Sequence, residues 1–475
     1  MDAVKHIPTE VVQLLSAAEV TEYGLIPFER SDDVLRCLCI EGVDCASAVE
    51  ELSVLNGWRI TTQPVEESEF RRIFAQYYHS DAASQQTSSR RPAEIDTGPA
   101  FLLSLVGEAF GCYASDIHFE PYEERCRIRF RIDGKLIERY VVDKRQYAPL
   151  INQIKIMSGL DISEKRLPQD GRIMYDRDGA KFDVRVSTLP SIYGEKVVMR
   201  LLTRHPELLE LKNLGLSARQ YEDYCRAIAK PFGMVLICGP TGSGKSTTLY
   251  ATLRRLNRVS ENILTIEDPV EYTMDGINQV QLKEEIGLTF AGALRTFLRQ
   301  DPDIIMLGEV RDPATAEMAV RSALTGHLLF STIHTNTAWG AVARLQDMGI
   351  HPYLISNTLV ATVAQRLVRL LCPHCKRETV ADDEDKSGIL SELKISKYYA
   401  PTGCDRCFYT GYSGRRAVYE VIPMDDELSA AVREGRSDVG DMLRRRGIMS
   451  LRDAVTDMFR RGETSLDELI PMLNC

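Results

Sequence analysis

The chain has 475 residues, of which 44% are hydrophobic and 27% charged, and it carries a formal net charge of −10. This length exceeds what one hydrophobic core supports, so about two to four domains are expected, with the composition of an ordinary globular protein. The acidic balance argues against a protein that binds the nucleic-acid backbone over its whole surface, because such proteins are usually basic. We therefore expect no nucleic-acid partner.

No apolar run approaches the ~18 residues of a membrane span, and the first residues lack the basic and apolar regions of a signal peptide. Two CxxC pairs stand among the twelve cysteines, which favours a reducing compartment with one metal site over a disulfide framework. These features predict a cytoplasmic protein that can still dock on a membrane complex.

The N-terminal region, residues 1–79, mixes short helical signals with turn residues and shows no catalytic constellation. The segment Asp44–Asn56 is predicted to be a helix that Asp44 caps. Three cysteines lack a fourth metal ligand and are interpreted as core thiols: Cys37, Cys39 and Cys45. We interpret this region as a small docking domain. The linker that follows it, residues 80–97, is too polar to bury a core.

Residues 98–205 are predicted to form an α+β domain that starts with a helix over residues 99–111. In the segment that follows, arginines alternate with apolar residues, and Asp133 and Gly134 supply a two-residue turn. We expect an antiparallel hairpin with one basic face.

Two further strands are predicted in this domain, after a second turn at Asp170 and Gly171. Arg185 and Arg200 lie on these strands. Taken alone, an arginine in such a place is more often a solvated surface charge than a functional group.

The pattern GxxxxGK[ST] follows a short apolar run at residues 234–238 and precedes helix-forming residues. Its glycines permit a turn whose backbone N–H groups point at one anion, and the helix dipole adds to this preference. Lys245 supplies a charge for the β- and γ-phosphates, and Ser246 a hydroxyl for Mg²⁺. The predicted ATP-binding loop comprises Gly239, Pro240, Thr241, Gly242, Ser243, Gly244, Lys245, Ser246 and Thr247.

Acidic residues follow two later apolar strands. Glu267, Asp268 and Glu271 end the first and are candidates to hold Mg²⁺ or its waters. Glu309 follows the second, where a glutamate can orient the water that attacks a γ-phosphate. Gly308 takes the place of the usual magnesium aspartate. Metal coordination is therefore expected from Ser246, the phosphates and Glu267.

Two histidines, His327 and His334, bracket another apolar strand. Their place in a phosphate-binding domain favours a γ-phosphate contact for at least one of them. Residues 343–372 are then predicted to be long and helical. Helices are also expected from residue 425 to the C-terminus.

Four cysteines in two CxxC pairs match a structural Zn²⁺ site in which each pair aims two thiolates at one ion. The pairs are Cys372 with Cys375 and Cys404 with Cys407. We predict a zinc-binding insertion over residues 372–407 that stabilises and docks but is not catalytic.

With these motifs in place, the chain resembles the secretion-type hexameric ATPases, in particular those that power type II secretion and type IV pilus assembly. The resemblance extends from about residue 95 to the C-terminus. It rests on GPTGSGKST, TIEDPVEY, LGEVRD and HLLFSTIHT in that order, and on SDIHFEP, LPQDGRI and DVRVSTLPSIYGEKVVMRLL before them. It implies an α/β fold, with a RecA-like P-loop motor domain over residues 206–475 behind the α+β domain.

The resemblance also implies roles for single residues. Glu309 becomes the catalytic carboxylate, with Lys245 and Ser246 as phosphate and magnesium ligands and His334 as the histidine that senses or contacts the γ-phosphate. Strand arginines at the places of Arg185 and Arg200 reach nucleotide in this family. Three more arginines belong to its ATP-site and domain-interface network: Arg295, Arg299 and Arg311.

By the same resemblance, the protein is expected to be an ATP hydrolase that works as a homo-hexamer with ATP, Mg²⁺ and Zn²⁺. Nucleotide binding would close the α+β domain onto the motor domain. The expected partners are an inner-membrane platform protein and an adaptor, which would dock the ring at the cytoplasmic face of the inner membrane. The four cysteines and the short N-terminal region favour type II secretion, with type IV pilus assembly as the alternative. A conjugation or DNA-uptake motor and a scaffold without turnover are the remaining hypotheses.

Overall fold

The computed structural model describes residues 7–12, 14–15, 17–31, 34–67, 69–70, 73–74, 99–123, 125–177, 180–202, 210–380, 388–408 and 410–473. The predicted linker, residues 80–97, lies outside these ranges. The chain forms two compact units. One, called here the P-loop unit, contains residues 205–371, 377–400 and 414–475, and the other, the N-terminal unit, contains the rest.

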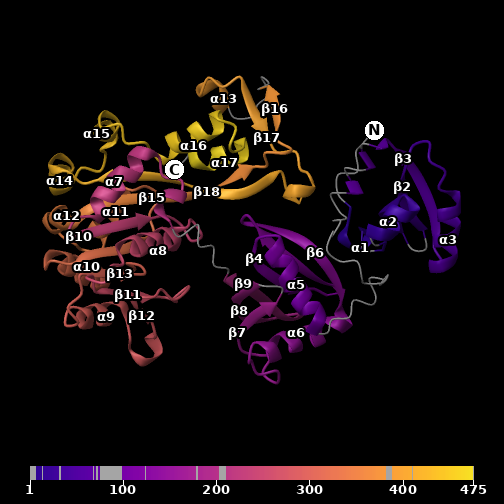
Figure 1. Ribbon diagram of the computed structural model, residues 1–475, viewed down its shortest axis with the longest axis horizontal. Coiled ribbons are helices and arrows are strands. Elements are labelled where there is room, and N and C mark those ends of the chain that lie inside the picture. The colour runs from indigo at the N-terminus through magenta and orange to yellow at the C-terminus, as the bar shows by residue number, and fades with distance from the viewer. Residues whose placement is uncertain are drawn as a thin grey trace. The chain divides into compact units, whose positions relative to one another are not determined.

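The P-loop unit is built on a sheet of seven strands in the order β12-β11-β13-β14-β10-β15-β18 (Figure 1). Parallel pairing joins every neighbouring pair from β12 to β15. The strands are β10 Gly233–Cys238, β11 Ile263–Glu267, β12 Asn278–Gln281, β13 Ile304–Leu307, β14 Leu328–Ile333, β15 Leu359–Leu371 and β18 Tyr412–Pro423. Every residue of β10, β11, β13 and β14 is buried, which explains why they read as continuous apolar runs.

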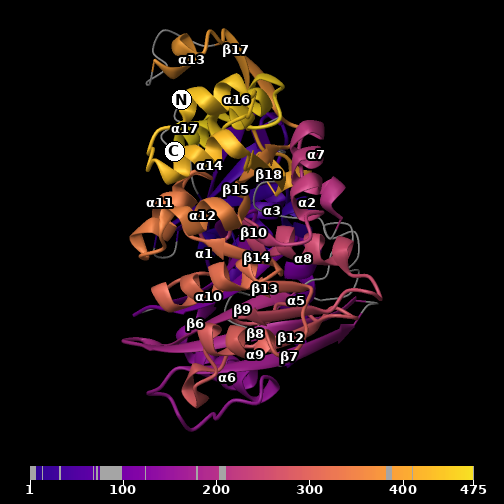
Figure 2. The same cartoon turned by 90° about the vertical axis from the view of Figure 1, so that its left-hand side faces the viewer.

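Helices cover both faces of this sheet (Figure 2). One face packs against α7 Ala218–Ile228 and α8 Lys245–Leu256, which contribute Tyr224, Leu249 and Leu253. The other packs against α9 Phe290–Phe297, α10 Pro313–Leu324, α11 Gly340–Asp347, α12 Pro352–Thr358 and the C-terminal helices. A mostly parallel sheet hidden on both faces is the predicted α/β arrangement.

The segment predicted to be one long helix, residues 343–372, is different in the structure. It holds the end of α11, then α12, and then the long strand β15, which pairs with β10. Nearly all of β15 is buried, so its apolar residues do not alternate with polar ones, and the sequence pattern resembles that of a buried helix. The helical prediction was wrong because pairing with β10 decides the conformation here.

After β18 the chain ends in four helices, as predicted: α14 Asp426–Arg433, α15 Gly440–Arg445, α16 Leu451–Arg460 and α17 Leu466–Leu473. A small hairpin of β16 Arg377–Val380 and β17 Lys397–Ala400 precedes β18, with the short helix α13 Ile389–Glu392 between its strands. Among the described residues, no helix has the length and apolar character needed to cross a membrane.

In the N-terminal unit, residues 99–202 form a six-stranded antiparallel sheet in the order β6-β5-β4-β9-β8-β7. Its strands are β4 Ala114–Pro121, β5 Arg125–Ile132, β6 Lys135–Asp143, β7 Gln169–Arg177, β8 Ala180–Ser191 and β9 Gly194–Leu202. Two helices, α5 Pro99–Gly111 and α6 Lys144–Met157, form a common core with one face of this sheet. The hairpin turn at Asp133 and Gly134 is confirmed, with φ of 47° and 85°.

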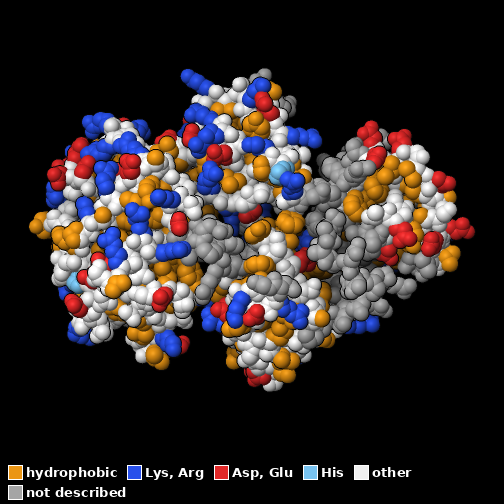
Figure 3. All heavy atoms as spheres, in the orientation of Figure 1, with side chains coloured by type: hydrophobic (Ala, Val, Ile, Leu, Met, Phe, Trp, Pro, Cys, Tyr) orange, Lys and Arg blue, Asp and Glu red, His pale blue; other side chains and the backbone are white. Residues whose placement is uncertain are grey.

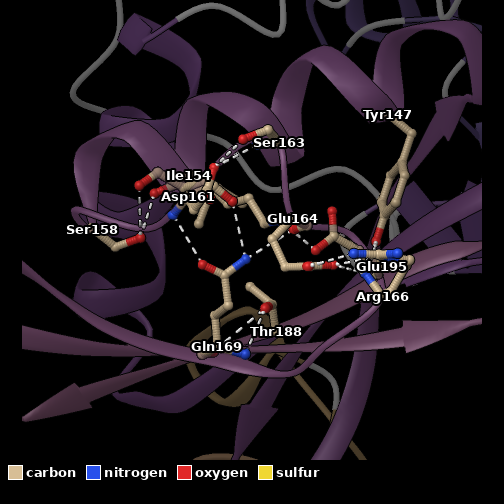
Figure 4. Close-up of polar contacts among 11 residues, drawn as sticks. Tyr147, Ile154, Ser158, Asp161, Ser163, Glu164, Arg166, Gln169, Thr188 and Glu195 are labelled. Carbon is tan, nitrogen blue, oxygen red and sulfur yellow. Dashed lines mark hydrogen bonds and ion pairs between the residues drawn. The ribbon is translucent and has the colours of Figure 1, made fainter.

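The predicted turn at Asp170 and Gly171 is wrong, because both residues lie inside β7. A Cβ at Gly171 would lie 2.5 Å from the Ser158 carbonyl oxygen, so glycine is needed for close packing against the loop after α6. Gln169 organises that loop, since it accepts from the Asp161 N–H and donates to the Glu164 carbonyl (Figure 4).

The start of the chain has its own small core. Strands β1 Leu25–Ser31, β2 Val34–Ile40 and β3 Arg59–Val65 form a sheet, with helices α1 Thr9–Val12, α2 Ala17–Tyr23 and α3 Ala46–Asn56. Cys45 occupies the N-cap position of α3, one residue later than predicted, while the Asp44 carboxylate accepts from the Ala46 N–H. Cys37 and Cys39 are buried in this core.

Candidate functional site

The carboxyl ends of four parallel strands bring the predicted phosphate-site residues to one edge of the sheet. Cys238, which precedes the P-loop, pairs with Ile333, which precedes His334. Next to it, Leu307 at the end of β13 pairs with Ser331. Because ligands of open α/β sheets bind outside the carboxyl ends of the strands, this edge is the candidate nucleotide site.

The P-loop wraps around the side chain of Lys245, the first residue of α8. Its ammonium donates hydrogen bonds to the carbonyl oxygens of Gly239 and Pro240, both at 2.9 Å. Burial lowers the pKa of Lys245, and the nearby Glu309 carboxylate opposes this shift. Ser246 and Thr247 follow in the first turn of α8, where backbone N–H groups and the helix dipole favour an anion.

Gly239 is required by close contacts. Its φ is +154°, and a Cβ there would lie 2.5 Å from the Ser243 hydroxyl oxygen and 2.7 Å from the Gln365 carbonyl oxygen. Any side chain would therefore push the loop away from β15. The structure thus gives a steric reason for the first glycine of the motif.

Gln365 on β15 supports the P-loop, and the sequence reasoning missed it. Its side-chain amide donates to the Ser243 carbonyl at 2.9 Å and its oxygen accepts from the Thr248 hydroxyl at 2.8 Å. The side chain is buried and ties the loop to the first turns of α8. Its polar character within an apolar run was the available signal, but the helical prediction hid it.

Arg366, the next residue of β15, was missed for the same reason. Its guanidinium donates to the Gln365 carbonyl at 3.0 Å and to the Asn336 carbonyl at 3.0 Å. It is mostly buried. Asn336 lies two residues after His334, so the Arg366 side chain links β15 to the loop that follows β14 and contains His334.

Glu309 follows β13 and lies beside His334 and Arg311. Its carboxylate is 3.4 Å from the Nε2 atom of His334 and forms an ion pair with Arg311. The Glu309 side chain is 16% exposed and that of His334 is 50% exposed, so the pair can be reached from solvent. The hydrogen bond to Glu309 raises the pKa of Arg311. Arg311 also lies 3.3 Å from Asp268.

Gly308 leaves little room for a larger residue. A Cβ there would lie 3.3 Å from the Ile266 carbonyl oxygen, 3.4 Å from the Glu267 Cα atom and 3.6 Å from Phe290. This crowding gives a structural reason for glycine where the usual magnesium aspartate would stand.

Glu267 is more enclosed than the prediction assumed. Its carboxylate accepts hydrogen bonds from the Tyr250 hydroxyl, the Thr265 hydroxyl and the Gln279 amide, and the residue is 5% exposed. Both carboxylate oxygens are therefore engaged inside the protein. In this arrangement Glu267 anchors the loop that carries Asp268.

His327 lies at the other end of β14. Its Nδ1 atom is 2.9 Å from the Ser322 carbonyl oxygen, next to the start of the strand. At ~3.3 Å per residue, the strand separates its two flanking histidines by roughly 20 Å. Of these two histidines, only His334 can therefore belong to the candidate nucleotide site.

The remaining predicted arginines lie in or after α9 and on the strands β8 and β9. Arg295 is exposed on α9, and Arg299 is exposed in the turn after this helix, where it donates to the Arg295 carbonyl at 2.9 Å. Arg185 on β8 pairs in register with Arg200 on β9, so their side chains share one face of the six-stranded sheet. Arg200 donates through Nε to Asp116 at 2.9 Å.

The four predicted zinc ligands form one cluster in the structure, with all four sulfurs within 4.8 Å of one another. The sulfurs of Cys372 and Cys404 are 3.8 Å apart, and those of Cys375 and Cys407 are 3.7 Å apart. Zn–S bonds of ~2.3 Å in a tetrahedron place sulfurs roughly 3.8 Å apart. The backbone N–H groups of Gly403 and Cys404 donate to cluster sulfurs, as second-shell donors do in metal sites. The donor set therefore fits Zn²⁺.

Residues 97–471 match the family described as type II/IV secretion system protein. The type II secretion system ATPase E of Vibrio cholerae is 48% identical over 382 residues, which cover 79% of this chain and 75% of that protein. The type IV pilus assembly ATPase PilB of Myxococcus xanthus is 41% identical, with 99% of this chain and 86% of that protein covered.

Among solved structures, the Legionella pneumophila ATPase DotB aligns with a TM-score of 0.60 at 21% identity, over 82% of this chain and 98% of its own. This likeness concerns the fold, and it agrees with the predicted RecA-like architecture. The match over residues 97–471 and the identity of 48% to a curated relative decide the family. The chain belongs to the type II/IV secretion system protein family.

Proposed function

We propose that this protein hydrolyses ATP to power protein secretion of the type II kind. The observation that carries the proposal is the meeting of Lys245, Glu309 and His334 at one strand edge, in a chain 48% identical to a type II secretion system ATPase. Phosphoryl transfer to water needs mainly positioning and charge neutralisation, and this edge offers both.

Each residue has a distinct task in this proposal. Lys245 and the P-loop N–H groups hold the phosphates, and Glu309 orients the attacking water while His334 contacts the γ-phosphate. Mg²⁺, when bound, neutralises developing phosphate charge, with Ser246 as its protein ligand. Glu267 acts near the metal through the loop that it anchors, because its own oxygens already accept three hydrogen bonds.

Five arginines complete the site in our proposal. Arg185 and Arg200 reach the nucleotide when the α+β domain, residues 98–205, closes onto the ATPase domain, residues 206–475. Arg295, Arg299 and Arg311 form the network of the ATP site and the domain interface, and the protein works as a homo-hexamer. Successive closure around the ring turns hydrolysis into displacement of a partner.

Docking is assigned to the first domain, residues 1–79, joined by the linker at residues 80–97. Its proposed partner is an adaptor that brings the ring to a platform protein at the cytoplasmic face of the inner membrane. The cysteine cluster holds one Zn²⁺ and stabilises the insertion over residues 372–407. Metal analysis of purified, reduced protein should find about one zinc per chain, and less than half an equivalent would contradict the assignment.

The central test is Glu309→Gln. This variant should bind ATP with near wild-type affinity but hydrolyse it roughly 100-fold more slowly, because the carboxylate that orients water is lost. Phosphate release and fluorescent-nucleotide binding measure the two properties separately. Glu317→Gln is a matched control, since Glu317 is exposed on α10 and pairs only with Arg321 in the described structure. Turnover of Glu309→Gln at the wild-type rate would remove Glu309 from its role.

Type IV pilus assembly is the second candidate, supported by the 41% identity to a PilB protein that matches 99% of this chain. Capture of membrane partners with the full-length chain distinguishes the two machines by which platform protein is recovered. On the face seen in Figure 3, Lys and Arg are interspersed with Asp and Glu, which speaks against a continuous basic track there. ATPase stimulation by single-stranded DNA would revive a nucleic-acid motor.

A further inference from the structure

A row of charged side chains crosses the face of the six-stranded sheet that does not pack on α5 and α6. This face is called here the open face. Asp116 on β4 lies opposite Arg131 on β5 and Arg200 on β9. Arg185 lies opposite Arg200 and, on its other side, opposite Arg172 on β7. Side chains that are directly opposite share a face, so four guanidinium groups line up with a single carboxylate.

Asp116 is almost entirely buried, with a relative exposure of 5%. Its Oδ1 atom accepts from the Nε of Arg200 at 2.9 Å, and its Oδ2 atom accepts from the Ser115 hydroxyl at 2.8 Å. The Nε of Arg131 lies 3.6 Å from Oδ2. A buried carboxylate without such partners would be costly, so Asp116 and these groups depend on one another.

The two arginines beside Asp116 are held differently. Arg131 donates from its terminal nitrogen Nη1 to the Gly134 carbonyl at 2.8 Å, so this nitrogen is bound to the hairpin turn. Arg200 is bound only through Nε, and its side chain is 60% exposed. Within the described parts of the chain, its two terminal nitrogens have no partner. Those two nitrogens form the planar fork that binds phosphate oxygens in bidentate fashion.

We propose that Asp116 is a positioning residue that holds Arg200 by its Nε and so presents the terminal fork of Arg200 to the phosphates of the nucleotide. This inference rests on the proposed function. It separates Arg200, whose fork stays available, from Arg131, one of whose terminal nitrogens binds the Gly134 carbonyl. It also assigns a purpose to the single carboxylate in the arginine row.

Lysine cannot replace Arg200 in this arrangement. Its one ammonium cannot bind Asp116 at one point and present a planar pair of donors at another. Arg200→Lys should therefore lose about as much turnover as Arg200→Ala, although it keeps the positive charge. If charge alone mattered, Arg200→Lys would keep most of the activity.

The experiment compares steady-state ATPase rates of the full-length chain and four variants: Asp116→Asn, Arg200→Ala, Arg200→Lys and the double variant Asp116→Asn/Arg200→Ala. We expect Arg200→Ala to lower kcat roughly 10- to 100-fold and Asp116→Asn about 10-fold, with KM changed less. In the Arg200→Ala background, Asp116→Asn should add almost nothing, because Asp116 acts through Arg200. Asp183→Asn is the control, since Asp183 is on the same face of β8.

The possible results test the positioning role of Asp116 and the proposed function separately. If Arg200→Ala is impaired but Asp116→Asn is not, or if their effects multiply, the positioning role is overturned and the proposed function survives. If the unmodified full-length chain releases no phosphate from ATP, the proposed function itself fails, whatever the variants do. If Asp116→Asn does not fold, Arg200→Lys decides: wild-type turnover overturns the inference, and a loss equal to that of Arg200→Ala supports it.

Discussion

The two large sheets of this protein carry their charged groups in opposite ways. In the P-loop unit, four neighbouring strands are buried throughout, and the polar groups of the site stand in loops at the strand ends. In the six-stranded sheet, charged residues lie along the strands on one face while the other face packs on α5 and α6. One sheet is hidden on both sides and the other on one side only.

This difference changes what holds each set of charges in place. At the strand ends, turns and buried hydrogen bonds fix the loop, so Lys245 is positioned largely by backbone carbonyls. On the open face, ion pairs between side chains hold the charged groups in place, as for Glu120 with Arg127 and Arg129. We therefore expect substitutions at the strand ends to reduce chemistry most, and substitutions along the open face to reduce stability most.

The largest effect is expected for Lys245→Ala. Loss of the only P-loop cation should reduce ATP turnover by at least about 100-fold, because phosphate charge is no longer neutralised, with little change in melting temperature. Phosphate release and thermal melting are the measurements. Lys230→Ala is the control, an exposed lysine near the amino ends of the same strands. A large drop in melting temperature with retained turnover would reverse the comparison.

Glu120 provides the matching test on the open face. Burial alone would raise the pKa of this carboxyl group, but hydrogen bonds from Arg129, Arg127 and Lys196 outweigh it and lower the pKa to about 2 from 4.5. The lowered pKa contributes stability that is fully present above pH 4.5 and is lost as the pH falls towards 2. Such a shift corresponds to roughly 3 kcal/mol.

Glu120→Gln should therefore destabilise the fold by about 3 kcal/mol near neutral pH, and this difference from the wild type should shrink as the solution is acidified. Chemical denaturation at several pH values measures it. The exposed pair of Lys181 and Asp176, on neighbouring strands of the same sheet, is the comparison. Asp176→Asn should change stability by less than about 1 kcal/mol. A pH-independent effect at Glu120 would show that packing, not charge, is responsible.

Gln365→Ala tests whether hydrogen bonds from a neighbouring strand hold the P-loop. Removing the amide leaves the Ser243 carbonyl without this buried donor, which should cost about 1–3 kcal/mol. We expect ATP affinity, measured by nucleotide binding, to fall about tenfold. We also expect the amide groups of the P-loop to lose protection against hydrogen exchange. Gln365→Glu retains the acceptor for Thr248 but not the donor for Ser243, so it should be no better. Unchanged ATP affinity in both variants would mean that the P-loop keeps its conformation without hydrogen bonds from Gln365.

The smallest effect on stability is expected for Arg299→Ala. Arg299 is exposed in the turn after α9, so the change in unfolding free energy should stay below about 0.5 kcal/mol. ATPase activity should nevertheless fall at protein concentrations that form rings, because we place this residue in the network of the ATP site and the domain interface. Activity and mass by light scattering, each measured against concentration, check this. Arg321→Ala is the control, because the Arg321 side chain is exposed on α10. Equal activity of the two variants would remove Arg299 from the proposed network.

Several features could be read from the sequence because they are local. The P-loop, the hairpin turn at Asp133 and Gly134 and the start and end of α5 depend on residues a few positions apart. The cysteine pairs also carried enough information, since each CxxC turn brings two sulfurs together by itself. Such short-range patterns predict structure without knowledge of the rest of the chain.

Other features depended on contacts between distant segments. Whether residues 359–371 form a strand or a helix is decided by pairing with β10, more than a hundred residues earlier, so Gln365 and Arg366 could not be assigned to the site. The glycine at position 171 reads as a turn until Ser158 is seen to pack against it.

The sequence by itself determined the chemistry of the phosphate loop, the glutamate and histidine that follow the later strands, and the four thiolates. Only the tertiary structure decided which groups hold these residues in place. It showed that Gln365 binds the P-loop and that Asp116 binds the Nε of Arg200. The physical reason is that a motif records residue types at short spacing, whereas support comes from side chains that strand pairing brings together from 84 to 122 residues away.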